Sequence, residues 1–189
     1  MSHYAALLDA NVLYPAPLRD LLMQLAVTDL FRAKWTADIH REWIDALLEN
    51  QPQRSRADLE RTRDLMNQHT RDCLVTEYEP LIESLVLPDP DDRHVLAAAI
   101  AGRCDVIVTH NLKDFPEDVL VRFGIEAQHP DEFLCNHLNL APGVFCGAVQ
   151  KVRRRLQNPP YGVDEYLDNL TRQGLAATVA ELKPFAQLL

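Results

Sequence analysis

Apolar residues in the first part of the chain form one short continuous run and then a helical stripe. The run at residues 4–8 ends at Asp9 and predicts a buried strand. Pro15 and Pro17 then open a segment in which leucines recur at helical spacing. This pattern predicts a helix with one buried face directly after the strand.

The next segments predict two helices and a doubtful strand. Thr36 suits an N-cap, and the apolar positions that follow it predict a helix over 37–50 with one side facing the core. Residues 54–70 are highly polar but keep helical spacing, so we expect an exposed helix there. Residues 73–75 could form a short strand.

The second half of the chain predicts two more strands separated by helices. Asp89 followed by Pro90 indicates a helix start, with Asp89 as the cap, and the buried stripe after it ends at Gly102. Residues 105–109 are β-branched and predict the clearest strand, and 125–128 a weaker one. From Pro130 onward the pattern is helical. Alternation of this kind predicts an α/β fold with a parallel sheet covered on both faces.

Length and composition fit one α/β domain with a small extension. The chain has 189 residues, of which 47% are hydrophobic, so a full core is expected. No apolar run reaches the roughly 18 residues that a membrane span needs, and the first fifteen residues lack the pattern of a signal peptide. We therefore expect a cytoplasmic protein with no membrane partner. The four cysteines form no CxxC pair, which favours buried reduced thiols.

The net charge of −9 argues against a nucleic-acid binder when it is taken alone. A carboxylate site that binds a divalent ion would reverse the local sign, so the argument is not decisive. Positive charge is also clustered in two segments, either as phosphate contacts or as solvated helix faces. The first cluster comprises Arg54, Arg56, Arg61, Arg63 and Arg71, and the second Lys151, Arg153, Arg154 and Arg155.

Two acidic positions fall where a parallel α/β sheet places its sites. Such sites form beyond the carboxyl ends of the strands, and both Asp9 and the loop from Thr109 to Asp114 lie at that end. An acid that closes an apolar strand is costly unless something pairs with it, and no Lys or Arg lies near Asp9 in sequence. A hard divalent cation bound by carboxylate oxygens would resolve this.

Four acids are the candidates for this site: Asp9, Glu42, Asp92 and Asp114. Each also has a structural interpretation. Asp9 could bond its own backbone in a turn near Asn11, Asp92 could favour the helix dipole, and Asp114 could cap the loop before Pro116. Glu42 could be a solvated helix residue, with Asp45 and Glu49 as rivals on the same helix.

Polar neighbours of these acids could support the chemistry. Asn11 and Thr109 could orient a metal-bound water or a phosphate oxygen. His94 and His110 lie near the site in sequence, but a single histidine is more often structural than catalytic. Asp89 and Asp91 are better interpreted as helix caps than as ligands.

The order of these motifs resembles the PIN domain family, of the kind found in VapC-type toxins. The resemblance covers about residues 4–130 and is carried by LLDANVLYPAPLRDLL, the helix with Glu42, and DPDDRHVLAAAIAGRCDVIVTHNLKDFP. The family's four acids fall on Asp9, Glu42, Asp92 and Asp114. Commonly retained polar positions of the family fall on Asn11, Thr109 and Asn111. Glu42 is the match with the weakest surrounding pattern.

The resemblance implies an α/β/α sandwich, Mg²⁺- or Mn²⁺-dependent cleavage of single-stranded RNA, frequent homodimers and a possible protein antitoxin that covers the acidic site. We therefore expect a nuclease domain at 1–130 and a C-terminal helical extension at 131–189, whose role the sequence does not indicate. Asp9, Asp92 and Asp114 would hold the metal, and Glu42 would complete the site.

Other functions stay open at this stage. A phosphatase with Asp9 as covalent nucleophile is disfavoured because such enzymes want a second Asp two residues on, where this chain has Asn11. A PIN nuclease could instead act on DNA or in RNA processing rather than as a toxin. A non-catalytic nucleic-acid-binding module that keeps the fold is the remaining alternative.

Overall fold

The computed structural model describes residues 4–189 and contains a parallel sheet in the order β2-β1-β3-β4. The strands are β1 (Ala5–Leu8), β2 (Arg32–Lys34), β3 (Val106–Val108) and β4 (Glu126–Gln128). Part of the N-terminal stretch that was compared with signal peptides, residues 1–3, lies outside the described residues. None of the helices described in 4–189 is both long and apolar enough to cross a membrane.

The two central strands are buried throughout because they are covered on both faces. All four residues of β1 and all three of β3 are buried. Leu7 of β1 pairs with Ile107 of β3 on one side and with Lys34 of β2 on the other. The near-continuous apolar runs of these strands are typical of a doubly covered parallel sheet.

Helices fill the connections between the strands. Before β3 lie α1 (Ala10–Leu13), α2 (Ala16–Ala26), α3 (Ala37–Asn50), α4 (Arg56–His69), α5 (Glu79–Ile82), the short 3-10 helix η1 (Pro90–Asp92) and α6 (Arg93–Ala101). After β3 lie the 3-10 helices η2 (Leu112–Asp114) and η3 (Val121–Phe123) on either side of α7 (Glu117–Leu120). After β4 lie α8 (Pro130–Leu140), α9 (Pro142–Arg155), α10 (Val163–Arg172), α11 (Ala176–Leu182) and η4 (Lys183–Leu188).

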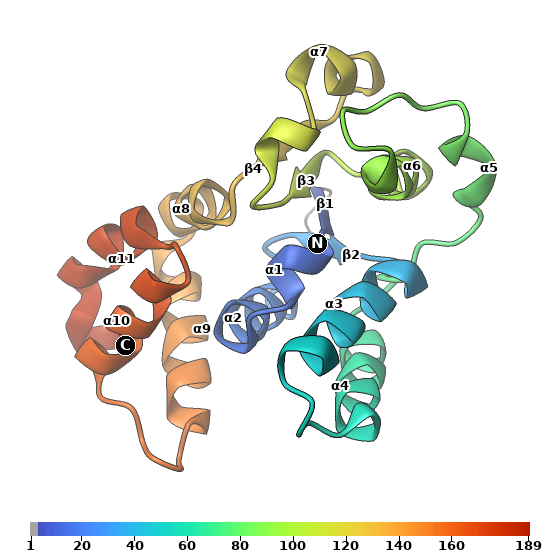
Figure 1. Cartoon of the computed structure of the whole chain (residues 1–189). Coiled ribbons are helices and arrows are strands. Elements are labelled where there is room, and N and C mark those ends of the chain that lie inside the picture. Colours follow the sequence, from blue (N-terminus) through green and yellow to red (C-terminus); the bar gives the residue numbers. More distant parts are fainter. Residues whose placement is uncertain (1–3) are drawn as a thin grey trace.

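The layers form the α/β/α sandwich that the sequence predicts. Helix α6 packs against β1 and β3, while α2 packs against β2. Figure 1 shows α5, α6 and α7 on one side of the sheet and α1, α2 and α3 on the other, with the C-terminal helices beside them. Helix α9 lies along α2, and α11 lies along α8, so the C-terminal helices are packed directly onto the sandwich.

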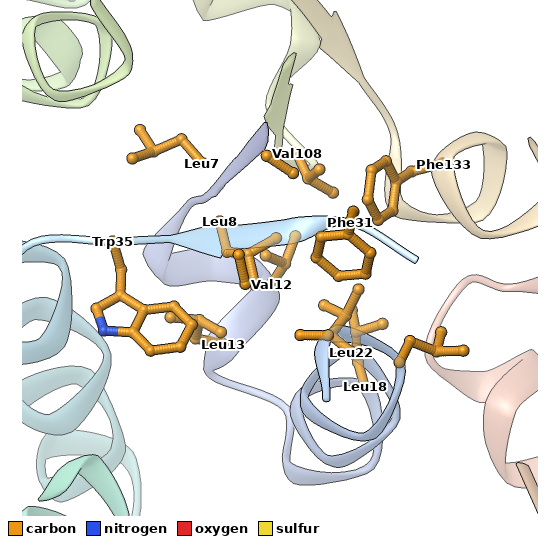
Figure 2. Close-up of a cluster of buried hydrophobic side chains, with 14 of the residues drawn as sticks. Leu7, Leu8, Val12, Leu13, Leu18, Leu22, Phe31, Trp35, Val108 and Phe133 are labelled. Atoms are coloured by element: carbon orange, nitrogen blue, oxygen red, sulfur yellow. The ribbon is translucent and has the colours of Figure 1, made fainter. Parts of the chain in front are cut away.

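One continuous core joins the sheet to the C-terminal helices. Leu8, Val12 and Leu18 belong to it from the N-terminal part, and Phe133 belongs to it from α8. The rings of Phe31 and Phe133 meet edge to face with their centroids 4.9 Å apart (Figure 2). Such aromatic pairs stabilise by about 0.5–1.5 kcal/mol beyond the area they bury.

Local sequence signals placed several helix ends correctly. Thr36 accepts a hydrogen bond from the backbone N–H of Ile39 and begins α3 at the predicted residue. Asp89 accepts from the backbone N–H of Asp91, and Pro90 is the first residue of η1. The predicted helix around Asp92 is divided, because a 3-10 turn precedes α6 and leaves Asp92 at its N-cap position.

Other segments differ from the expectation. The short strand that residues 73–75 could form is reduced, in the described part of the chain, to an isolated parallel bridge between Leu74 and Trp35. The sequence interpretation missed β2 because Arg32 and Lys34 flank its only buried residue, Ala33. It also missed the one-turn helices α1, α5 and α7, which are too short to show a period.

Candidate active site

Asp9 lies at the carboxyl end of β1 and is the N-cap of α1. The whole residue is 5% exposed. Its Oδ1 accepts a hydrogen bond of 2.6 Å from the backbone N–H of Ala10. The turn interpretation of Asp9 is therefore part of its role, because the carboxylate accepts from the backbone N–H of the next residue.

The second carboxylate oxygen of Asp9 is held by two side chains from different elements. Asn11 Nδ2 donates to Asp9 Oδ2 over 2.6 Å and also reaches Thr109 Oγ1 over 2.9 Å. The Thr109 hydroxyl donates to the same oxygen of Asp9 over 2.7 Å. Because Thr109 follows β3, this network joins the ends of the two central strands.

This network fixes the orientation and charge of Asp9. Burial raises the pKa of Asp9, while the hydrogen bonds from Thr109 and Ala10 lower it; the charge of Glu42 raises it further, and His94 lowers it. Thr109 is fully buried. Thr109 and Asn11 therefore act on Asp9 in this structure, and their contact with substrate stays a prediction.

Asp92 lies beside Asp9 at the start of α6. Burial raises its pKa to about 6, and the charges of Asp9, Asp89 and Asp114 all act in the same direction. Like charges raise a carboxyl pKa in this way only at short range. The structure thus brings Asp9, Asp92 and Asp114 from three separate segments to one edge of the sheet.

Asp114 and Asn111 lie on the loop that follows β3. Asp114 is the last residue of η2 and is half-buried. Asn111 is exposed, and its backbone N–H donates to Thr109 Oγ1 over 3.0 Å. The loop is therefore anchored to the same hydroxyl that holds Asp9.

Glu42 reaches the site from α3 and is paired with a histidine. Its Oε1 lies 2.9 Å from His94 Nε2, with side-chain exposures of 41% for Glu42 and 15% for His94. Burial lowers the pKa of His94, but the hydrogen bond and charge of Glu42, with Asp38 and Asp9, raise it above its ordinary value overall. His94 Nδ1 is buried without a hydrogen-bond partner in the described chain.

The sequence interpretation gave His94 little weight, and this pair was missed. The helices that carry Glu42 and His94 are remote in sequence, and their facing surfaces are set only by packing. A weak signal existed in the half-polar face of α6 next to Asp92. Asp38 was also missed. Its carboxylate contacts Tyr78 and Arg41. The hydrogen bond from Tyr78 lowers the pKa of Asp38, and burial opposes that effect.

The other acids considered for the site make different contacts or are exposed to solvent. Asp45 forms an ion pair with Arg56 over 2.6 Å. Asp91 and Glu49 are exposed. Asp89 caps η1, as expected, although its charge also contributes to the raised pKa of Asp92.

The donor set suits a hard divalent cation. Within residues 4–189, no Lys or Arg forms an ion pair with Asp9, Asp92 or Asp114, although Asp9 accepts hydrogen bonds from neutral donors. In the same described part of the chain, no three His, Cys, Asp or Glu side chains already converge as a metal-holding group. The residues therefore match a cation by chemistry, and side-chain rotation would be needed to gather them around it.

A contact between two histidines connects this edge to the C-terminal helices. The backbone N–H of His110 donates to Asn11 Oδ1 over 3.1 Å. His110 Nδ1 lies 3.0 Å from His129 Nε2, and His129 Nδ1 accepts from the backbone N–H of Asp131 to cap α8. His110 is thus linked to the start of the extension.

Comparisons with known proteins match both parts of the chain. Residues 5–113 match the model of a family described as PIN domain, which includes every candidate acid except Asp114. Residues 130–184 match a family described as the VapC50 C-terminal domain. These two matches leave residues 114–129, with α7, η3 and β4, between them.

A curated relative agrees with both family matches. The chain is 43% identical over 82 residues to "Putative ribonuclease VapC50" of Mycobacterium tuberculosis (strain ATCC 25618 / H37Rv). The aligned stretch is 43% of this chain and 48% of the relative, so the chain spans about half the length of the relative it matches. No solved structure matches the chain.

Proposed function

Because the chain belongs to the PIN domain family, we propose that it is a cytoplasmic, metal-dependent endoribonuclease that hydrolyses phosphodiester bonds of single-stranded RNA. The observation that carries this proposal is the placement of Asp9, Asp92 and Asp114 at one sheet edge without a compensating Lys or Arg in the described chain. The name of the relative supports the ribonuclease activity. We further propose, from the resemblance to VapC-type toxins, that the chain acts as the toxin of a toxin–antitoxin pair.

Asp9, Asp92 and Asp114 would hold Mg²⁺ or Mn²⁺ in this site, with Glu42 completing it. A bound ion of this kind supplies an activated water and stabilises negative charge on the phosphate. An in-line attack of water would leave a 5′-phosphate and a 3′-hydroxyl.

The chain's own residues prepare this site in three ways. Asn11 and Thr109 hold the carboxylate of Asp9 in one orientation through bonds of 2.6 and 2.7 Å. His94 holds Glu42 at the edge of the site. The apolar residues of β1 exclude water from beneath Asp9, which strengthens its interaction with any cation above it.

The proposal is tested first by cleavage of single-stranded RNA with Mg²⁺ or Mn²⁺. We expect Asp9→Asn, Asp92→Ala and Asp114→Ala each to lose activity by orders of magnitude, whereas the exposed control Asp91→Asn keeps it. Single-stranded DNA of the same sequence serves as the competing substrate. Near wild-type cleavage by Asp9→Asn would refute the assignment of the site, and preferred cleavage of DNA would refute the substrate class.

Thermal melts test the metal separately from activity. An ion at about a hundred times its Kd stabilises the folded state by roughly 2.7 kcal/mol. Mg²⁺ or Mn²⁺ should therefore raise the Tm near pH 7.5 and do little near pH 4.5, where protons compete for the carboxylates. An equal metal-induced shift in Asp9→Asn would mean that the ions bind elsewhere.

The proposed partners need their own measurements. A homodimer is checked by light scattering of the purified chain. A protein antitoxin is checked by co-expression with the product of a short neighbouring reading frame, which should form a complex and suppress RNA cleavage. Without such a partner, a role in RNA processing replaces the toxin role.

A further inference from the structure

A pocket of about 450 Å³ lies where α2 meets α9 and α10, away from the carboxylate site. Pro17 and Asp20 of α2 form one wall, Arg155 at the end of α9 another, and Tyr166 of α10 a third. The loop around Pro159 also lines it. A volume of this size accommodates a small planar ligand, because binding pockets usually measure about 300–1,000 Å³.

Tyr166 gives the first sign that this pocket has a ligand. The residue is 1% exposed, and its hydroxyl makes no hydrogen bond within the described residues. Burial, together with the charge of Asp20, raises the pKa of Tyr166, so the phenol stays protonated and able to donate. An unsatisfied buried hydroxyl costs about 1–3 kcal/mol, so this group gains from a partner supplied in the pocket.

Asp20 and Arg155 bring opposite charges to the same pocket without pairing. Within residues 4–189, neither belongs to a salt bridge and the Asp20 carboxylate accepts no hydrogen bond. Asp20 is exposed as a residue, but the protein atoms around its carboxyl still raise its pKa against the lowering effect of Arg19 and Arg155. Arg155 Nη2 donates to Gln24 Oε1 over 2.7 Å, which leaves its other N–H groups available.

This arrangement matches guanine among the nucleobases. Guanine presents two adjacent donors, N1–H and N2–H, which one carboxylate such as Asp20 can accept together. Its O6 and N7 acceptors are the commonest partners of an arginine such as Arg155. The rings of Tyr161 and Pro159 provide flat walls, and single-stranded RNA is recognised by such stacking combined with bonds to the base edge.

The positive charge next to the pocket is suited to a phosphate chain. The hypothesis that all of Lys151 and Arg153–155 contact RNA needs revision, because Arg153 donates to the oxygens of Leu189 and Tyr161. Lys151 and Arg154 are exposed, and their side chains make no hydrogen bond or ion pair in the described part of the chain. These two cations are therefore free to meet phosphate oxygens beside the pocket.

We propose that this pocket is a subsite for an unpaired guanine base of the RNA substrate, with Asp20 and Arg155 contacting its edge and Lys151 and Arg154 the adjoining phosphates. The inference rests on the proposed ribonuclease function. The position is suitable, because Pro17 and Asp20 lie on the helix that follows α1, and Asp9 is the N-cap of α1. One strand of RNA could thus reach both places.

The test measures binding without cleavage. Wild-type protein in chelator is titrated with a labelled 12-nucleotide RNA of uridines that contains one guanosine, and with the same RNA carrying inosine, which lacks only the 2-amino group. We expect wild type to prefer the guanosine RNA about 5- to 150-fold, as loss of a good bidentate contact to a base predicts. Asp20→Asn should reduce this preference to near one. The exposed control Asp168→Asn, which does not line the pocket, should keep it.

Tyr166→Phe provides a second variant that should fold at least as well as wild type, because it removes an unpaired buried hydroxyl. We expect it to bind the guanosine RNA about 2- to 10-fold more weakly, with an unchanged or higher Tm.

Equal affinity of wild type for the two RNAs, or an intact preference in Asp20→Asn, would overturn the inference and leave the pocket to another occupant, such as a side chain of a partner protein. Cleavage with Mg²⁺ or Mn²⁺ is read separately, so failure of the proposed function shows as intact RNA and failure of the subsite as lost discrimination.

Discussion

Asp92→Asn should stabilise the metal-free protein at neutral pH while it removes the proposed activity. The side chain of Asp92 makes no hydrogen bond to the described residues, so the substitution takes away a charge and no cap. That charge is unfavourable because Asp92 is partly desolvated and faces Asp9, Asp89 and Asp114. An isosteric amide relieves the repulsion without changing the packing of α6.

The size of the effect follows from the pKa of Asp92, which rises from 3.8 to about 6. Each pH unit between these values corresponds to about 1.4 kcal/mol, so the full difference is about 3 kcal/mol. Because the side chain is part exposed, solvent screening reduces this to about 1.5 kcal/mol. In a chain of this length, the Tm should rise by about 3–6 °C.

The sign reverses the usual behaviour of a carboxylate. A raised pKa in the folded state means that Asp92 destabilises the fold when it is ionised, and that stability returns as pH falls through about 6. The gain from Asp92→Asn should therefore fall below half its neutral value at pH 4.5, where the native wild type already carries the proton.

Thermal melts in chelator at pH 7.5 and 4.5 measure this, with Asp91→Asn as the matched control on the same turn. Asp91 is exposed, and its variant should change the Tm little at either pH. No gain at pH 7.5, or an equal gain at both pH values, would refute the view that Asp92 faces the other acids.

Three further predictions concern the fold around the site. Burial lowers the pKa of His40 to about 4, so at pH values between 4 and 6.5 the unfolded chain binds a proton that the folded chain does not bind. About 3 kcal/mol of stability should therefore disappear as pH falls from 6.5 to 4. Urea unfolding in the Asp92→Asn background, where the opposing effect of that carboxyl is absent, measures this loss, and a free energy of unfolding that does not change with pH would contradict it. Gly102→Ala should cost about 1–3 kcal/mol in urea unfolding, because a Cβ there would lie 2.9 Å from both Ala98 O and Val75 Cγ2. The control Gly147→Ala, in open space within α9, should instead stabilise by up to about 1 kcal/mol. Equal effects of the two substitutions would mean that Gly102 has room for a side chain. Asn11→Asp should cost at least about 2 kcal/mol of folding stability at pH 7.5, since it replaces an amide donor 2.6 Å from Asp9 Oδ2 by a carboxylate of the same charge. If the Tm of this variant does not recover on mild acidification, the loss comes from packing and not from charge repulsion.

The sequence predicted the parts of the fold that depend on neighbouring residues. The helix at 37–50 was placed correctly because its cap and its period are both local. The strand ending at Asp9 and the strand before Thr109 were found because each is a buried apolar run. Strand β2 was not found because its identity comes from pairing with β1, and its own residues Arg32 and Lys34 carry no apolar signal.

The same distinction between local sequence signals and long-range packing applies to the site. The sequence predicts Asp9, Asp92 and Asp114 at one edge, because parallel strands end there and α6 starts there. The effect of Asp9 and Asp114 on the pKa of Asp92 agrees with this, whereas their role as metal ligands stays a prediction. The partners of these acids could not be predicted in detail. Asn11 and Thr109 bind the Asp9 carboxylate directly, and His94 meets Glu42 only because α3 and α6 are packed as they are.

The ring contact between Phe31 and Phe133 bears on whether the two matched parts of the chain can fold separately. Phe31 precedes the edge strand β2 and is 1% exposed, and Phe133, which covers it, belongs to α8. A fragment that stopped before α8 would open this apolar surface to solvent and create a site for aggregation. The C-terminal helices therefore complete the core around the sheet, and the two parts should unfold in a single cooperative step.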